Sequence, residues 1–262
     1  MHILLKTHNK YISVKEITEY FFGLDYSQTN ELTGIDNYES GLMVTTKFSE
    51  DGKELEQEHF LEGEPDYKTI YKYNELNQLI ETLNVNPSNT PLRKVIFRYD
   101  KNGLKTESLL FTDMSNINSK LIRLYNNELR LISESFIHYN GGKNISYFYE
   151  YDNDIKEKTC IIKDDQGNML EKVISLYNDE GNIILSREFN SDNNLESETE
   201  YSYDHHNNLL KTDIRNYSGS DIETMQNRYE YVYDNMNNWI KYIHYAAHEE
   251  LSSVVFRNIV YY

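Results

Sequence analysis

The chain has 262 residues, which fits one large domain or two ordinary ones, and a formal net charge of −17. This charge excludes a surface for nucleic acid or anionic lipid, because phosphate binding needs clustered Lys and Arg, whereas a basic partner would be attracted. The single cysteine, Cys160, excludes an internal disulfide and is expected to be a buried, inert thiol.

Residues 1–40 form the first predicted unit, an N-terminal cap or a degenerate repeat. Its apolar residues Ile12, Val14 and Ile17 fit no clean period, and a short helix is one form that the cap could take. The opening MHILLKTHNK has an apolar run of three residues, too short for a signal-peptide core, and no stretch approaches a membrane-spanning length. We therefore expect a cytoplasmic protein with no membrane partner.

Residues 41–262 form the second unit, a continuous array built on one recurring phrase. The copies YSYDHHNNLL (201–210) and YVYDNMNNWI (231–240) show it best. If the second aromatic residue of each copy is taken as its anchor, successive anchors lie 25 or 26 residues apart, and the last interval is 30 residues. The anchors are Phe48, Tyr73, Tyr99, Tyr125, Tyr151, Tyr177, Tyr203 and Tyr233. Such a period indicates a repeat architecture.

Within each copy, the residue types predict a hairpin turn. An Asx or Ser residue follows the anchor, and in six of the eight copies Gly or Asn comes three residues later. The Asx side chain can accept hydrogen bonds from backbone amides of the turn, and Gly or Asn tolerates the left-handed conformation that closes it. We assign turn and tyrosine-ladder roles to Tyr99, Asp100, Gly103, Tyr151, Asp152, Tyr177, Gly181, Tyr203, Asp204, Asn207, Tyr233, Asp234 and Asn237.

A second turn falls near the middle of each period, as in DDQGN (164–168) and NSDNN (190–194). Each period is therefore two strands and two turns, and tight turns make consecutive strands antiparallel. The predicted fold is all-β: a long antiparallel meander of about 16–20 strands. Because twist accumulates in wide sheets, we expect this meander to be an open sheet that curls or twists, with tyrosines stacked along one face.

The phrases FRYDKNG, YEYDND, SLYNDEGN, YSYDHHNN and YVYDNMNN resemble the YD repeat of bacterial Rhs proteins and teneurins. The resemblance covers roughly residues 45–245. The period here is longer than the usual family repeat, Asn often replaces Gly, and the Asp-Pro motif of Rhs autoproteolysis is missing. In that family the repeats form a spiralling β-shell around a payload. The resemblance implies a sheet fragment with a concave or extended surface, and it implies no enzyme.

Two groups of residues are candidate metal sites. His244 and His248 in HYAAHEE have a zinc spacing only on a helix, and on the expected strand they would lie about 13 Å apart. The acidic turns DDQGN (164–168) and NDEGN (178–182) lack the alternating carboxylates of a calcium loop, and Asp at a turn needs no ligand to explain it. We therefore expect no metal and no cofactor.

No catalytic motif is visible: the sequence has no Gly-rich phosphate loop, no Ser-centred elbow and no Cys with an evident His partner. A non-enzyme is therefore expected. Exposed aromatic residues could form a platform for protein or carbohydrate, and the candidates are Tyr217, Trp239, Tyr242 and Tyr245. If function resides in the repeats, it should lie on residues that vary between copies, such as His205, His206 and Trp239.

The leading hypothesis from sequence is a non-catalytic protein-binding module, an immunity or antitoxin-type protein that neutralises a basic secreted toxin. Negative charge would speed the capture of such a partner. The alternative is a structural or carbohydrate-contacting repeat protein associated with the cell envelope. The oligomeric state is left open by the sequence.

Overall fold

The computed structural model describes residues 5–7, 10–12, 14–23, 42–219, 221–246 and 250–262. Every regular element among these residues is a β-strand. No helix long and apolar enough to cross a membrane occurs in this part of the chain. The prediction of a short helix in the N-terminal cap is wrong for the described residues before position 24, because they form three strands. The rest of the expected cap, residues 24–40, lies outside the described residues.

The chain divides into two compact units, residues 1–94 with 228–262, and residues 95–227. The strands within unit 1 are β1 (Leu5–Thr7), β2 (Lys10–Ile12), β3 (Val14–Gly23), β4 (Leu42–Phe48), β5 (Glu54–Leu61), β6 (Glu64–Tyr73), β7 (Leu79–Val85), β19 (Trp239–Ala246) and β20 (Glu250–Tyr261). Two strands, β8 (Pro91–Tyr99) and β18 (Asp221–Tyr233), contain the boundaries between the units.

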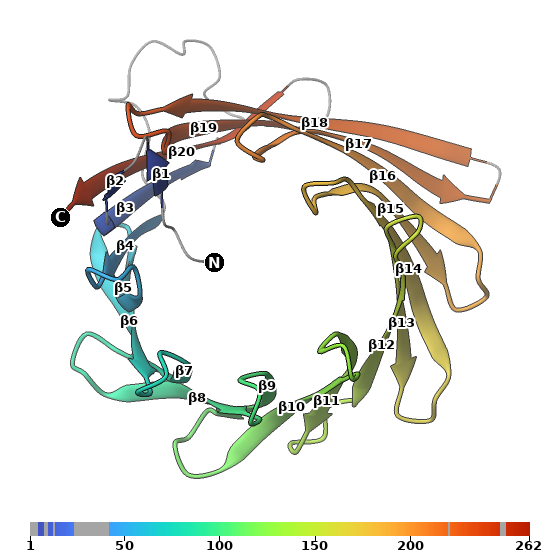
Figure 1. Ribbon diagram of the computed structural model, residues 1–262, viewed down its shortest axis with the longest axis horizontal. Coiled ribbons are helices and arrows are strands. Elements are labelled where there is room, and N and C mark those ends of the chain that lie inside the picture. Colours follow the sequence, from blue (N-terminus) through green and yellow to red (C-terminus); the bar gives the residue numbers. More distant parts are fainter. Residues whose placement is uncertain (1–4, 8–9, 13, 24–41, 220, 247–249) are drawn as a thin grey trace. The chain divides into compact units, whose positions relative to one another are not determined.

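Unit 2 is a run of consecutive antiparallel strands, coloured green through orange in Figure 1. Its strands are β9 (Lys105–Phe111), β10 (Ile117–Tyr125), β11 (Leu131–His138), β12 (Ile145–Asp152), β13 (Glu157–Asp164), β14 (Met169–Tyr177), β15 (Ile183–Asn190), β16 (Leu195–Tyr203) and β17 (Leu209–Ser218). Most of them have seven to nine residues, which fits two strands and two turns in a period of 26 residues.

The sheet is closed, and the prediction of an open curled sheet is wrong. Strand β20 pairs with β3 in an antiparallel ladder from Ser253↔Gly23 to Tyr261↔Val14, so the strands from β3 to β20 form one closed barrel of 18 strands. The physical reason is the sheet edge: an open meander leaves unpaired backbone NH and CO groups on its two outer strands, and closure pairs them.

The segment expected to be a cap supplies the closing strand. In unit 1, β3 pairs with β20 on one side and with β4 on the other. Val14 and Ile17 of β3 are buried against Phe48 of β4, with Ile259 and Tyr261 of β20 packed on the same cluster. Burial of these apolar side chains stabilises the closing ladder, each contributing about 1.5–3 kcal/mol when fully buried.

The turns that follow seven of the eight anchors share one geometry, seen clearly at residues 204–208, whereas the turn after Tyr151 has its positive φ at Lys156. The Asp204 backbone amide donates to the Asn208 carbonyl at 2.9 Å, and Asp204 Oδ1 accepts from the amides of His206 and Asn208 at 2.8 Å each. Asn207 has a positive φ of 64°. The corresponding positive φ values in other copies belong to Gly52, Asn77, Gly103, Leu129, Gly181 and Asn237. The mid-period turns after Asn86, Asp164 and Asn190 have the same geometry.

Leu129 occupies this left-handed position, with a φ of 63°, although it is neither Gly nor Asn. A branched side chain in this conformation costs about 1–2 kcal/mol, and Leu129 is 52% exposed, so its burial offsets little of that cost. We expect Leu129→Asn to raise the free energy of unfolding by about 1 kcal/mol, measured by urea denaturation. Leu76→Asn is the control: Leu76 is an exposed turn leucine without a positive φ, and its replacement should change stability little. Equal effects of the two substitutions would contradict the explanation from strain.

Tyrosine hydroxyls join four of the anchors to the preceding strand. Tyr125 Oη donates to the Lys105 carbonyl at 2.9 Å, Tyr151 Oη to Leu131 at 2.9 Å, and Tyr203 Oη to Ile183 at 2.7 Å. In unit 1, Tyr73 Oη donates to the Glu54 carbonyl at 2.9 Å. Each acceptor is the first residue of the strand before the anchor's strand, so the hydroxyl extends the pairing beyond the backbone ladder. The face that carries these anchors is called the tyrosine face.

The opposite face of β15, β16 and β17 carries charged side chains and is called the ion-pair face. Glu198 accepts from Arg187 Nε at 2.7 Å and from Arg215 Nη1 at 2.7 Å, and Arg215 also contacts Glu200 at 2.9 Å. Alternation along each strand separates the two faces, since Tyr201 and Tyr203 point away from Glu198 and Glu200. In these strands the Glu198 ion pairs and the anchor tyrosine therefore lie on opposite faces.

Candidate functional site

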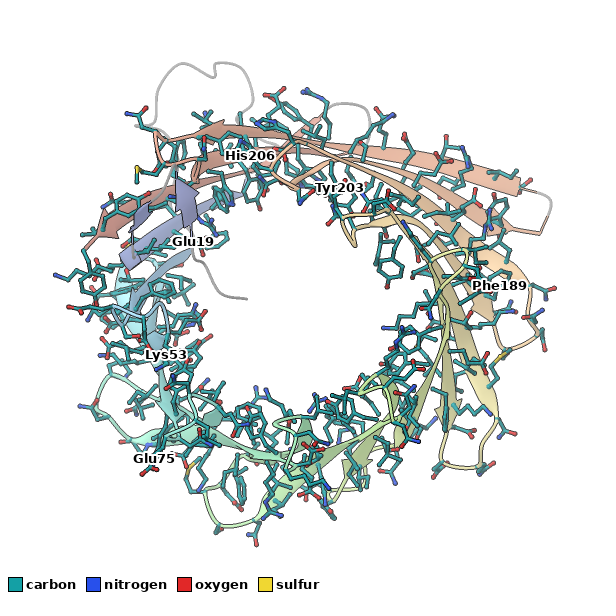
Figure 2. All side chains as sticks on the ribbon, in the orientation of Figure 1. Glu19, Lys53, Glu75, Phe189, Tyr203 and His206 are labelled. Carbon is teal, nitrogen blue, oxygen red and sulfur yellow. The ribbon has the colours of Figure 1, made fainter. Side chains whose placement is uncertain are left out.

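The candidate site lies where two turns of unit 2 meet. The turns that follow β10, β12, β14 and β16 lie at the same end of the strands of this unit, and this row of turns is called the Asx edge. Neighbouring turns there are linked by side chains: Arg130 Nη1 donates to Asn153 Oδ1 at 2.8 Å, Lys156 pairs with Asp179, and Asn182 Nδ2 donates to Asn207 Oδ1 at 3.0 Å. Figure 2 shows Tyr203 and His206 at this end of the strands and Phe189 at the opposite end.

An open pocket of about 420 Å³ is formed by the last linked pair of turns and the end of β16. Polar side chains line most of it, and β16 contributes two tyrosine rings. The lining residues are Asn178, Glu180, Ile184, Tyr201, Ser202, Tyr203, Asp204, His205 and Asn207. All nine belong to unit 2, and they come from two consecutive repeats.

Three of the lining groups make bonds that hold the pocket together. The Tyr203 hydroxyl donates to Ile183, Asp204 Oδ1 accepts two turn amides, and Asn207 Oδ1 accepts from Asn182. The rings and turns are therefore positioned by the repeat itself, before any ligand is present. Such preorganisation lowers the entropy lost on binding.

Several of the other lining groups are exposed to solvent. Glu180 and His205 are exposed, and Ile184 is 40% exposed at the bulge that opens β15. Burial raises the pKa of the Tyr201 hydroxyl, so this hydroxyl stays protonated and neutral near pH 7. Aromatic rings, amides, a carboxylate and an imidazole together suit a ligand with many hydroxyl groups and a flat apolar face.

Two of the binding residues named from sequence, Trp239 and Tyr242, lie together in unit 1. Their ring centroids are 5.4 Å apart in an edge-on arrangement, and Tyr231 contacts both rings. The Arg257 guanidinium lies 3.3 Å from the centre of the Trp239 ring and pairs with Glu19 at 2.6 Å. Burial lowers the pKa of Arg257, and Glu19 opposes this shift. The cluster joins β18, β19, β20 and β3.

The other two are not brought together with the pocket. Tyr217 lies near the end of β17, and Tyr245 lies on β19, with the Arg228 guanidinium 4.0 Å from its ring centre and Glu230 Oε2 3.4 Å from its hydroxyl. Three residues were proposed because they vary between copies, and of these only His205 lines the pocket. Trp239 lies in unit 1, and His206 contacts the His205 ring at 3.8 Å between centroids.

The residues considered as metal ligands make structural contacts where the structure describes them. Asp164 Oδ1 accepts from the amides of Gln166 and Asn168, and the Asn168 side chain chiefly accounts for the lowered pKa of this carboxyl. His244 stacks on Tyr229, its Nε2 is buried without a partner, and burial lowers its pKa. His248 lies outside the described residues. Among those described, no group of three or more His, Cys, Asp or Glu side chains could hold a metal ion.

Cys160 is half-buried on β13. Burial is the main cause that raises the pKa of its thiol, and the raised pKa keeps the thiol protonated near pH 7. A protonated, partly covered thiol is a poor nucleophile, so Cys160 provides no reactive group to the tyrosine face.

Sequence reasoning missed Tyr201, Glu180 and Asn178 as pocket residues. In the repeat pattern Tyr201 looks like every other ladder residue, and Asn178 and Glu180 look like ordinary turn residues. The pocket lies where the turns of two neighbouring copies meet. Variation between copies, which pointed to His205, was the available signal.

No protein-family model and no curated protein matches the chain. Among solved structures, it is similar to a porin-like protein from Bacteroides uniformis, with 10% identity, a TM-score of 0.51, and coverage of 94% of this chain and 96% of that one. Chains of the TcdB2-TccC3-TEV and TcdB2-TccC3 structures also match, with 15% and 11% identity and TM-scores of 0.39 and 0.30. They cover 82% and 79% of this chain but 12% and 14% of theirs. The porin-like likeness concerns the fold alone.

Two expectations from sequence are corrected by the closed barrel and its porin-like counterpart. A cytoplasmic location was inferred from the lack of a long apolar run, but barrels of this kind need no such run, and the expectation is overturned. The immunity-protein hypothesis rested on the negative charge, on repeats without catalytic motifs and on the resemblance to YD-repeat proteins. It conflicts with a sheet that closes on itself.

Proposed function

We propose that the chain is a non-catalytic, carbohydrate-contacting repeat barrel associated with the cell envelope, and that it belongs to the YD-repeat proteins. The observation that carries the proposal is the pocket at the Asx edge, where Tyr201 and Tyr203 stand beside amide and carboxylate side chains. Sugar rings present apolar C–H faces that stack on aromatic rings, and hydroxyl groups that pair with Asn, Asp and Glu. The pocket offers both kinds of contact within about 420 Å³.

The charged side chains support a sheet that contacts water rather than lipid. Arg187, Glu198 and Arg215 lie on the ion-pair face, and Lys158, Glu171 and Glu188 lie on the tyrosine face. A transmembrane barrel needs an apolar band on its outer face, and Arg or Lys at the bilayer midplane costs about 2–4 kcal/mol. Envelope association without insertion of these strands in lipid fits this distribution of charge.

The proposal predicts that neutral oligosaccharides bind and that Tyr201→Ala weakens their binding at least about tenfold. Loss of one stacked ring at the centre of a site removes about 1.4 kcal/mol or more. Isothermal titration with a set of cello-, malto- and chito-oligosaccharides measures this effect. Recovery of each oligosaccharide intact after incubation tests the absence of catalysis.

Tyr71→Ala is the matched control, because Tyr71 also lies two residues before its anchor and is half-buried, but belongs to unit 1 and does not line the pocket. This variant should keep the affinity of the wild-type protein. If no oligosaccharide binds with a dissociation constant below about 10 mM, or if both variants lose the same affinity, the assignment to this pocket fails.

A further inference from the structure

Carboxylates set the charge of the pocket. Glu180 and Asp204 are among its lining residues, and no Lys or Arg is among them. Lys156, at the end of the neighbouring turn, is paired with Asp179 of the first turn of the pocket. The chain as a whole carries a net charge of −17, which adds a negative potential at the site.

The two carboxylates have different structural roles. Asp204 Oδ1 is held by the amides of His206 and Asn208 and keeps the second turn in shape. Glu180 occupies the third position of its own turn, 178–182. The backbone hydrogen bonds of this turn are donated by the amides of Asn178 and Gly181, so none of them involves the Glu180 side chain. Its exposed side chain is therefore the carboxylate best placed to contact a ligand without disturbing the fold.

We infer that the pocket selects an amino sugar with a protonated amine, whose ring contacts Tyr201 while its ammonium group pairs with Glu180. This inference rests on the proposed carbohydrate-binding function and specifies its ligand class. An acidic sugar would place a like charge beside Glu180 and Asp204, and a neutral or N-acetylated sugar would gain no ion pair. The pocket is open, so the ion pair remains partly hydrated and gives a preference of about three- to tenfold.

The test compares three probes by isothermal titration at about pH 7: the tetrasaccharides of glucosamine, N-acetylglucosamine and galacturonic acid. We expect affinities in that order. The preference for glucosamine over its acetylated form should shrink at high salt and at about pH 9, where the amine loses its charge.

Glu180→Gln removes the charge while it keeps the shape. It should lower the affinity for the glucosamine tetramer about three- to tenfold and leave that for the acetylated tetramer unchanged. Glu128→Gln is the matched control, because Glu128 holds the same third position in the turn after Tyr125, is 70% exposed, and does not line the pocket.

The outcomes separate the two proposals. Equal binding of the glucosamine and acetylated tetramers, or equal effects of Glu180→Gln and Glu128→Gln, would overturn the charge selectivity and leave carbohydrate binding intact. Tighter binding of the galacturonic acid tetramer would overturn it as well. Absence of binding by all three probes and by the neutral oligosaccharides would refute both.

Discussion

Replacing Arg257 with alanine is expected to lower the free energy of unfolding by about 3 kcal/mol. Arg257 lies face-on to Trp239 at 3.3 Å and is paired with Glu19 at 2.6 Å, and their side chains are 24% and 21% exposed. The substitution removes a desolvated cation–π contact and a charge-assisted hydrogen bond, and it leaves Glu19 without its partner. Urea denaturation followed by far-ultraviolet circular dichroism measures the change without relying on Trp239 as the reporter.

Arg215→Ala is the control for this experiment. Arg215 also bonds two glutamates, but it is 41% exposed on the ion-pair face, where such pairs contribute less than about 1 kcal/mol. In the wild-type protein, Trp239 fluorescence should also report the contact, because it is the single tryptophan of the chain. A loss of stability no larger for Arg257→Ala than for Arg215→Ala would show that the closing ladder does not depend on this cluster.

The same cluster explains why the sequence predicted the strands but not their closure. The period of 26 residues gives the hairpins directly, because each turn joins neighbours that are close in the chain. The Arg257–Glu19 bond joins residues 238 positions apart, and β3 carries at most a degenerate copy of the repeat phrase. A local pattern contains no information on which distant strand will meet β20, and the apolar residues Val14 and Ile17, which fitted no period, are the ones that the closure buries.

The candidate site was only partly predictable for a related reason. The roles of Tyr203, Asp204 and Asn207 follow from the phrase, because each recurs at the same position in several copies. The pocket also needs two turns to lie side by side, and the proximity of the turns at 178–182 and 204–208 becomes evident only when the strands are paired. The sequence could point to His205 as a varying residue, but it could not place Glu180 beside it.

Removal of the ladder hydroxyls in unit 2 is expected to have the other large effect on stability. The triple substitution Tyr125→Phe, Tyr151→Phe and Tyr203→Phe deletes three hydrogen bonds of 2.7–2.9 Å and keeps all three rings. Each bond contributes about 0.5–1.5 kcal/mol, and the sites are distinct, so we expect a combined loss of about 3 kcal/mol. Thermal and urea denaturation of the single and triple variants measure both the total and its additivity.

Tyr139→Phe is the matched control, because Tyr139 is 55% exposed and its hydroxyl is not part of the ladder, so its removal should change stability by less than about 0.5 kcal/mol. The single variant Tyr203→Phe adds a test of function, since Tyr203 belongs to the ladder and to the pocket. Its ring remains available for stacking, so oligosaccharide affinity should stay within about twofold of the wild-type value while stability falls. A parallel loss of affinity would mean that the pocket depends on the hydroxyl bond to Ile183 as well as on the ring, and that ligand binding and the repeat ladder are coupled at this residue.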